Sequence, residues 1–385
     1  MAAETAVWRD QLTSSESAQL MREAGVIAQP RPDILVVGGG IVGVATAAAC
    51  YQAGAGSVQL IEAGMLGSGA TGGAAGLLVP EVHVWSDSEA FVALARSSLE
   101  LWRKLEQTLP DAVGLIGLDW IGPPPGPGGS GGRPHPAAEP LDAGQMASLV
   151  PGLACPAPAV LIRRQARVNP LRALARLAAD VPSVATRTAA TSVTVAGNRL
   201  VSVSTTAGDI HPGAVVFATG IPPSLPGLAT GLPASRVKGH LLVTEPSPVR
   251  LPGTVVPVAT QLEDGRLLAG GTTDIGDGSP GVRQDIIDSI LADLYAQLPP
   301  VTGLRPAYQW CCFRPRHPDG YPVIDQVPGL ANAWLTSGHF RTGILMAPVT
   351  AQIITRWISA GRPPPEAAAW SSDRFEAKQP GRRCW

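Results

Sequence analysis

The segment "DILVVGGGIVGVATAAACYQAGAGSVQLIEAG", residues 33–64, constrains the fold more than any other part of the chain. A β-branched run at 34–37 predicts a strand, and three consecutive glycines follow it. The Ala-rich stretch after them is typical of a helix that stops near Gly54, and a second apolar run at 58–61 ends at Glu62. This order of strand, glycine turn, helix, strand and acid predicts a βαβ unit.

The glycines fit the pattern GxGxxG, and each has a physical reason. Gly38 permits a tight turn, Gly40 leaves room for a pyrophosphate, and Gly43 lets the helix lie close to the strand. The N–H groups of the helix N-terminus then face the phosphates, and an acid at Glu62 can bind ribose hydroxyls. The segment therefore predicts a bound dinucleotide rather than a merely structural glycine turn. The expected contacts are Gly38, Gly40, Ile41, Val42, Gly43, Glu62 and Ala63.

Composition and charge exclude several other classes of protein. The chain has 385 residues, of which 45% are hydrophobic and 15% charged, enough apolar material for a large core. The net charge of −1 gives no basic field for nucleic acid. The five cysteines show no paired spacing and the N-terminus is too polar for a signal peptide, which predicts a cytoplasmic protein. The apolar run at 34–50 contains the three glycines, so we expect no membrane span.

A second stretch of small residues, "GSGATGGAAGLLVP" at 67–80, follows the acid directly. Small side chains let the backbone approach a large ligand, and an NAD domain would usually continue to its next helix and strand here. The stretch favours FAD, with contacts at Ala70, Thr71, Gly76 and Leu77; a flexible loop is the alternative.

With "VVFATG", "CFRPRHPDGYPVID" and "GHFRTGILMAPVT" added, the chain resembles the D-amino-acid oxidase superfamily of FAD enzymes, in its glycine-oxidase and sarcosine-oxidase-like branch. The resemblance implies an α/β (α+β) fold in which a Rossmann-type FAD-binding domain is interleaved with an antiparallel-sheet substrate domain. We expect an N-terminal extension at 1–30, in which Thr13 and Glu16 are spaced as the capping box of a short helix, and a C-terminal tail at 371–385. The FAD-binding parts are expected at 31–80, 166–230 and 316–370, and the substrate-domain parts at 81–165 and 231–315.

The middle of the chain carries weaker signals. Short β-rich runs between 184 and 218 predict antiparallel strands, and the resemblance implies that Val193 and Gly220 contact the cofactor. The Pro/Gly-rich insert at 122–140 predicts a loop, in which we expect His135 to be solvated.

The resemblance implies that Arg314 binds a substrate carboxylate, and chemistry supports this because a planar guanidinium binds a carboxylate through two parallel hydrogen bonds. Arg341 is expected either to shape the same pocket or to be structural, and His339 to be a structural hydrogen-bonding group. The helix after Thr342 would direct its N-terminus at the flavin. Contacts are therefore expected at Thr342, Gly343, Ile344 and Leu345.

Cys312 lies seven residues before Asp319, the spacing at which sarcosine-oxidase-like members attach FAD covalently. The two interpretations are a thioether to FAD and a small buried thiol. The Arg-Pro context that follows Cys312 is that of the non-covalent branch, which favours the buried thiol.

The predicted reaction is oxidation of the C–N bond of a small amino acid or N-substituted amino acid, with hydride transfer to the flavin and hydrolysis of the imine.

The tyrosine that helps to hold the carboxylate in relatives is missing, and Val258 is the nearest residue, which predicts a bulkier or more apolar substrate than glycine. Sarcosine-oxidase-like relatives use a lysine near the flavin to activate O2, but none of the three lysines of this chain falls in the strand "RLLAGG". The electron acceptor is therefore either O2 or another compound. A non-catalytic flavin subunit and an NAD-dependent dehydrogenase are the alternatives, and a homo-oligomer or a heteromeric partner is left open.

Overall fold

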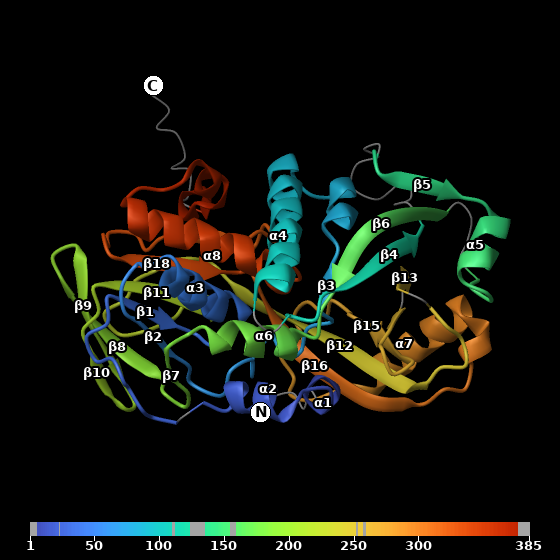
Figure 1. Ribbon diagram of the computed structural model, residues 1–385, viewed down its shortest axis with the longest axis horizontal. Helices are drawn as coiled ribbons and strands as arrows, with labels where there is room; N and C mark the ends of the chain where they lie inside the picture. The colour runs from blue at the N-terminus through green and yellow to red at the C-terminus, as the bar shows by residue number, and fades with distance from the viewer. Residues whose placement is uncertain are drawn as a thin grey trace, which may run out of the picture.

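The computed structural model describes residues 6–22, 24–109, 112–123, 135–154, 159–251, 253–256 and 259–375. Two β-sheets dominate these residues, and Figure 1 shows them side by side with helices packed on each. Among the described residues, no helix is long and apolar enough to cross a membrane.

The first sheet is mainly parallel and has the strand order β17-β18-β11-β1-β2-β7. β1 and β2 lie side by side as the sequence predicts, joined by the helix α3. β17 is the antiparallel edge strand. The bounds are β1 Ile34–Val37, α3 Ile41–Gln52, β2 Val58–Ile61, β7 Ser183–Ala185, β11 Ala214–Gly220, β17 Val323–Gln326 and β18 Ala333–Ser337.

Helices cover one face of this sheet and a β-meander covers the other (Figure 1). The helices are α3, α6 (Pro170–Ala179) and α8 (Gly343–Ala360), with α4 (Glu89–Thr108) packed on α8. The meander consists of β8 (Ala190–Ala196), β9 (Arg199–Thr205) and β10 (Gly208–Ile210), which pair antiparallel. The prediction of antiparallel strands is confirmed here but wrong for β11, which pairs parallel with β1 because its buried, β-branched residues suit the centre of a sheet.

The second sheet is mostly antiparallel and has the order β16-β12-β15-β14-β13-β4-β6-β3, with β5 beside β6. The helix α7 (Gln284–Gln297) packs on it and buries a separate apolar core. The strands are β3 Leu77–Leu78, β4 Ile116–Gly122, β5 Ala138–Leu141, β6 Ala159–Arg167, β12 Ser235–Pro246, β13 Thr254–Val256, β14 Ala259–Gln261, β15 Arg266–Gly270 and β16 Pro306–Arg316. The short helices are α5 (Ala143–Leu149), η1 (Pro80–Trp85), η2 (Pro299–Val301), η3 (Pro365–Trp370) and η4 (Ser372–Phe375).

The N-terminal segment forms two short helices, α1 (Ala6–Asp10) and α2 (Ser14–Leu20). The predicted capping box is confirmed, because Thr13 Oγ1 accepts the Glu16 N–H and the Glu16 carboxylate accepts the Thr13 N–H. The segment is part of the core, since Val7, Trp8 and Leu20 are buried.

His135 corrects one expectation for the Pro/Gly-rich insert. Its side chain is only 2% exposed, and its ring packs against that of Trp85 with centroids 4.8 Å apart. Nε2 also lies 3.0 Å from the carbonyl oxygen of Glu81, so tertiary contacts bury a residue that the composition of the insert predicts to be solvated. Residues 124–134 of the insert and Val258 lie outside the described residues.

Candidate active site

A cleft of about 780 Å³ lies where the two sheets meet. It extends from the glycine turn after β1 to strands β12 and β16, outside the carboxyl ends of the parallel strands, where α/β proteins bind ligands. Most of the predicted site residues line it. They are Gly38, Gly40, Ile41, Val42, Glu62, Ala70, Thr71, Gly76, Leu77, Gly220, Cys312, Arg314, Arg341, Thr342, Gly343, Ile344 and Leu345.

Glycine is required at the dinucleotide end of the cleft. Gly38 has φ +119°, and a Cβ there would collide with the carbonyl of Ala218 on β11. Gly43 does not line the cleft; a Cβ on it would collide with the carbonyl of Gly38, so it lets α3 pack close to the turn as predicted. Glu62 Oε2 accepts the Gly39 N–H at 2.7 Å, which holds the turn against β2.

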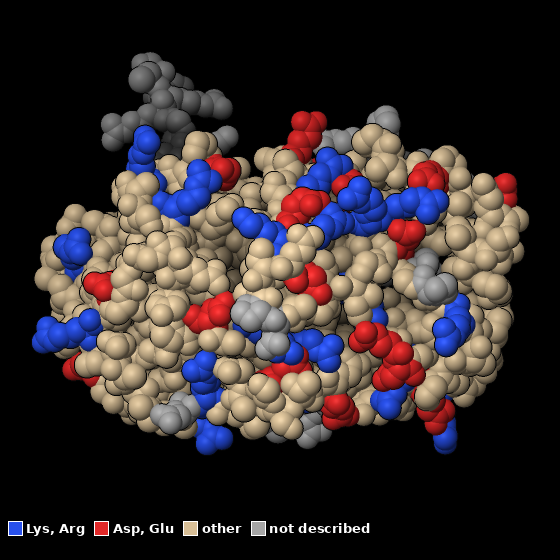
Figure 2. Space-filling model, viewed as in Figure 1, with Lys and Arg blue, Asp and Glu red and all other residues tan. Residues whose placement is uncertain are grey.

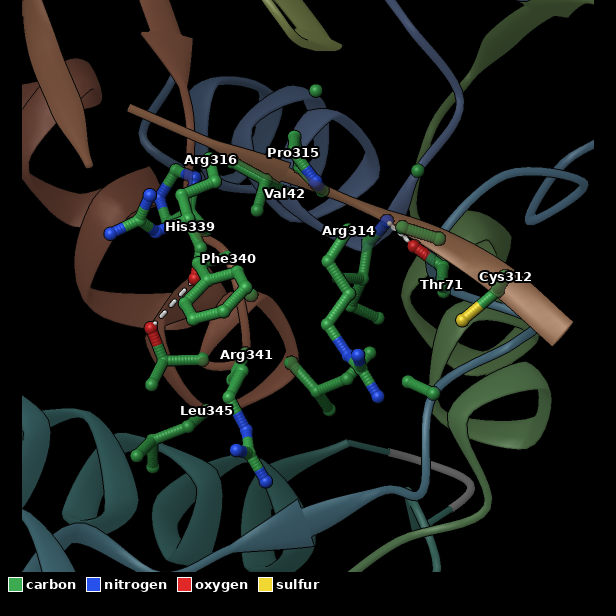
Figure 3. Close-up of a pocket in the computed structure, with 18 of the residues that line it drawn as sticks. Val42, Thr71, Cys312, Arg314, Pro315, Arg316, His339, Phe340, Arg341 and Leu345 are labelled. Atoms are coloured by element: carbon green, nitrogen blue, oxygen red, sulfur yellow. Dashed lines mark hydrogen bonds between the residues drawn. The ribbon is translucent and has the colours of Figure 1, made fainter. Parts of the chain in front are cut away.

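The loop at 67–76 closes over the N-terminus of α3. The N-cap residue, Gly40, has no side chain to offer, and Thr71 Oγ1 instead accepts the Ile41 N–H at 3.0 Å (Figure 3). Gly76 has φ +76° and lies against the carbonyl of Val168, where a Cβ would collide.

Three donors from distant parts of the chain hold this loop in place. Trp8 Nε1 donates to the carbonyl of Ala74 at 3.0 Å, and Trp310 Nε1 donates to that of Gly73 at 3.1 Å. Cys312 Sγ also donates to Gly73, at 3.3 Å. Sequence reasoning missed both tryptophans, because no local pattern links them to the loop.

The N-terminus of α8 forms another wall. Pro348 has no N–H to bond the Ile344 carbonyl four residues earlier, and Trp102 Nε1 of α4 donates to that carbonyl instead, at 3.1 Å. Phe340, just before the helix, has φ 47°, a conformation that brings the chain sharply into α8. The first N–H groups of α8 have no partners within the helix, and the residues that carry them line the cleft.

Arg314 extends from β16 into the cleft (Figure 3). Its Nη1 donates to the carbonyl of Thr272 at 2.6 Å. The guanidinium crosses Gly239 on β12, where any Cβ would collide with Nη1. Gly239 and Thr272 therefore fix the direction of this side chain, and neither was predicted from the sequence.

A buried polar cluster on the other side of β12 anchors the loop that carries Thr272. Lys238 is fully buried, and its Nζ donates to Ser279 O at 3.0 Å and to Asp277 at 3.3 Å. His240 Nδ1 lies 2.8 Å from Asp274 Oδ2. These contacts hold the loop against β12, and Arg314 of the neighbouring strand β16 lies across β12 at Gly239.

Arg341 points into the cleft on the same side as Arg314 (Figure 3). Surrounding protein lowers the pKa of Arg341, and the nearby charge of Arg314 lowers it further. Within the described residues, neither guanidinium pairs with a carboxylate. Arg316 also lines the cleft, but it donates to Pro318 O and lies over the Phe340 ring.

His339 lines the cleft as a neutral group. Burial lowers its pKa to about 3, and its Nε2 lies 3.1 Å from Thr350 Oγ1. A structural hydrogen-bonding role fits this environment, as expected. His83 and Asp87, which sequence reasoning missed despite their i, i+4 spacing, also line the cleft, with His83 Nδ1 2.9 Å from Asp87 Oδ2.

The Cys312 thiol is buried, and burial raises its pKa, so the thiolate that a thioether link requires is disfavoured. Besides Gly43, two further predicted contacts, Ala63 and Val193, do not line the cleft. Val193 lies on β8 within the apolar core between the parallel sheet and the meander, and its N–H donates to Pro226.

These residues fit a bound FAD. The glycines leave a cradle that side chains would fill, and the N-termini of α3 and α8 both face the cleft. Thr336 Oγ1 lines the cleft and is buried without a hydrogen-bond partner among the described residues, as expected of a group that a ligand satisfies. The fold and site thus define a flavin-dependent oxidoreductase.

Comparisons with known proteins identify the family. The family model described as FAD dependent oxidoreductase (DAO) matches residues 33–357, so the chain belongs to that family. It is similar to a glycine oxidase of Pseudomonas aeruginosa, at 29% identity over 351 residues, which cover 86% of this chain and 95% of that protein. This similarity places it in the glycine oxidase-like branch and does not favour the NAD-dependent alternative.

Solved structures confirm the fold. A glycine oxidase from Geobacillus kaustophilus matches with a TM-score of 0.78 and 24% identity, covering 89% of this chain and 99% of that one. An L-proline dehydrogenase from P. horikoshii matches with a TM-score of 0.80 and 19% identity, covering 90% and 98%.

Proposed function

We propose that this enzyme oxidises the C–N bond of a small amino acid or N-substituted amino acid whose carboxylate binds Arg314. The observation that carries the proposal is the guanidinium itself. It projects into the cleft, Thr272 and Gly239 fix its direction, and no carboxylate of the described residues neutralises it. A substrate carboxylate would accept two parallel hydrogen bonds from such a group. The similarity to glycine oxidases over most of the chain supports the same substrate class.

The residues of the cleft would act mainly by binding and orientation. FAD, when bound, supplies the two-electron acceptor. Arg314 would hold the carboxylate, so that the Cα that loses its hydride would be held in an oriented complex. Leu77, Leu241 and Phe91 line the same volume and would limit the access of water. The imine product would then hydrolyse to an oxo acid and an amine or ammonia.

We further propose that an acceptor other than O2 reoxidises the flavin. Neither described lysine lines the cleft: Lys238 is buried on the far side of β12, and Lys104 is exposed on α4. The fold is shared by an oxidase and a dehydrogenase. Slow reoxidation by O2 in stopped flow would agree with this proposal, and fast reoxidation would contradict it. We also propose a cytoplasmic location and a homo-oligomeric or heteromeric assembly.

Substitution of Arg314 tests the substrate assignment. The anaerobic visible spectrum should bleach on addition of amino acids or N-methyl amino acids. In Arg314→Ala, KM should rise by about tenfold to a hundredfold, the loss expected for hydrogen bonds to a charged group. Arg305→Ala is the matched control, since Arg305 is 80% exposed and pairs with Glu245 outside the cleft. An unchanged KM in Arg314→Ala, with flavin content equal to the parent, would refute the assignment.

A further inference from the structure

Two guanidinium groups enter the cleft from separate elements. Arg314 comes from β16 and Arg341 from the turn before α8, and Figure 3 shows both pointing to the same side of the open volume. Arg314 donates to one backbone carbonyl, that of Thr272. Within the described residues, Arg341 has no hydrogen-bond or ion-pair partner.

The acidic side chains that line the cleft are engaged elsewhere. Glu62 accepts the N–H groups of Gly39 and Gly64, both at 2.7 Å, at the dinucleotide end. Asp87 pairs with His83 at 2.9 Å. Asp319 accepts Arg374 Nε at 2.7 Å. The two arginines therefore leave an excess of positive charge that no carboxylate of the described lining offsets.

The cofactor does not account for this excess. The expected pyrophosphate position is at the glycine turn and the N-terminus of α3, at the other end of the cleft. The residues at the N-terminus of α8 line the cleft, and their free N–H groups would favour the negative charge of a reduced flavin. Two adjacent cations repel each other, and a ligand with two negative charges would relieve that repulsion better than a ligand with one.

We infer that Arg341 is a second anion subsite beside Arg314, and that the enzyme prefers substrates with two carboxylates. Such a substrate is an amino dicarboxylate or an N-carboxyalkyl amino acid. One carboxylate binds Arg314 and positions the C–N bond, and the other binds Arg341. This inference rests on the proposed function and extends it from a small amino acid to a dianionic one.

Sarcosine and iminodiacetate form the matched pair of substrates for the test, because both are N-substituted glycines and they differ by one carboxylate. The rate of anaerobic flavin bleaching is measured at increasing concentrations of each, together with glycine and both enantiomers of aspartate. At least one dicarboxylate should have a rate constant per unit concentration about tenfold or more above that of its monocarboxylate partner. Added salt should lower the rate constant for the dicarboxylate more than that for the monocarboxylate.

A titration without turnover supplies an independent measurement. Acetate and malonate shift the flavin absorption when they bind beside it, and neither carries an amine to be oxidised. Malonate should bind the holoenzyme about tenfold or more tightly than acetate.

Variants of Arg341 test the residue itself. Arg341→Met should lower the preference for iminodiacetate over sarcosine, and for malonate over acetate, by about tenfold. Arg341→Lys keeps the charge and should restore part of both preferences. Arg316→Met is the matched control, because the guanidinium of Arg316 lies in the same cleft but donates to the carbonyl of Pro318. This variant should leave both preferences close to the parent values. Flavin content reports whether each variant is folded.

The outcomes separate this inference from the proposed function. If monocarboxylates bleach the flavin and no dicarboxylate does so faster, the second subsite is wrong while the proposed function stands. If Arg341→Met lowers the rates with sarcosine and iminodiacetate equally, Arg341 is not a selective subsite. If no amine of either class bleaches the flavin, the proposed function itself fails.

Discussion

At the scale of single residues, the candidate site depends on close approaches between side chains and backbone. Arg314 can lie across β12 only because Gly239 has no side chain. Its Nη1 then donates a hydrogen bond to the Thr272 carbonyl. The guanidinium is thus oriented in advance, which would lower the entropy cost of binding the proposed substrate carboxylate.

Gly239→Ala should raise KM for carboxylate substrates, because the new Cβ collides with the Arg314 guanidinium and forces it to turn. We expect an increase of about tenfold, since oriented hydrogen bonds to a charged group are lost. Steady-state kinetics measure the effect. Gly117→Ala on β4 is the control, because Gly117 has open space around its missing side chain. If both variants keep the parent KM, the close approach has no functional role.

The Cys312 thiol should not carry FAD covalently. Burial raises its pKa, and Sγ donates to the Gly73 carbonyl, so the thiolate needed for attack is scarce. Acid precipitation of the holoenzyme should leave the yellow colour in the supernatant, and Cys312→Ala should still be yellow. Colour that stays with the pellet and disappears in Cys312→Ala would show a thioether.

At the scale of elements, segments far apart in the chain hold the walls of the cleft. Helix α4 supplies Trp102 to the carbonyl that Pro348 leaves free in α8. The N-terminal helix α1 supplies Trp8 to the loop at 67–76. The N-terminal segment therefore supports a loop that lines the cleft.

Trp8→Ala should destabilise the protein and weaken FAD retention together. Trp8 is 1% exposed, and replacing a buried tryptophan by alanine costs about 3–5 kcal/mol. Thermal unfolding and the flavin content after gel filtration measure the two effects. Met21→Ala, in the same segment but 59% exposed, should change neither. If the Trp8→Ala protein retains FAD as tightly as the parent, α1 does not contribute to FAD binding.

At the scale of the whole molecule, two buried histidines link stability to pH. Burial lowers the pKa of His339 to about 3, and burial also lowers the pKa of His317. The unfolded chain therefore binds protons at these positions from about pH 6.5 downwards, while the folded protein does not. The contribution of these neutral histidines to the free energy of unfolding is complete above about pH 6.5 and is lost as the pH falls towards 3.

The free energy of unfolding should decrease between pH 6.5 and 5, where most carboxylates are still ionised. The expected slope is at most about 1.4 kcal/mol per pH unit for each histidine. Urea unfolding at a series of pH values measures it. His339→Gln can still bond Thr350 and should flatten the curve. A parent curve that is level across this window would show that the buried histidines are protonated when folded.

Local sequence patterns were enough to predict the local structures and the class of ligand. The turn at 38–43, the capping box at Thr13 and Glu16 and the helix after Thr342 all appear where the pattern predicts them, because each depends on neighbours within a few residues. The family resemblance also assigned Arg314 and Arg341 to one region, and both line the cleft.

The surroundings of these residues, in contrast, depend on how distant parts of the chain pack together. Gly239 below Arg314, Trp8 on the loop at 67–76 and the burial of His135 join positions that are far apart in the chain. The parallel pairing of β11 with β1 likewise joins strands that are far apart in the chain. Such contacts follow from strand register and from the packing of whole elements, which no local spacing encodes. The physical reason is that a side chain's burial and partners depend on the opposite surface, which folding supplies.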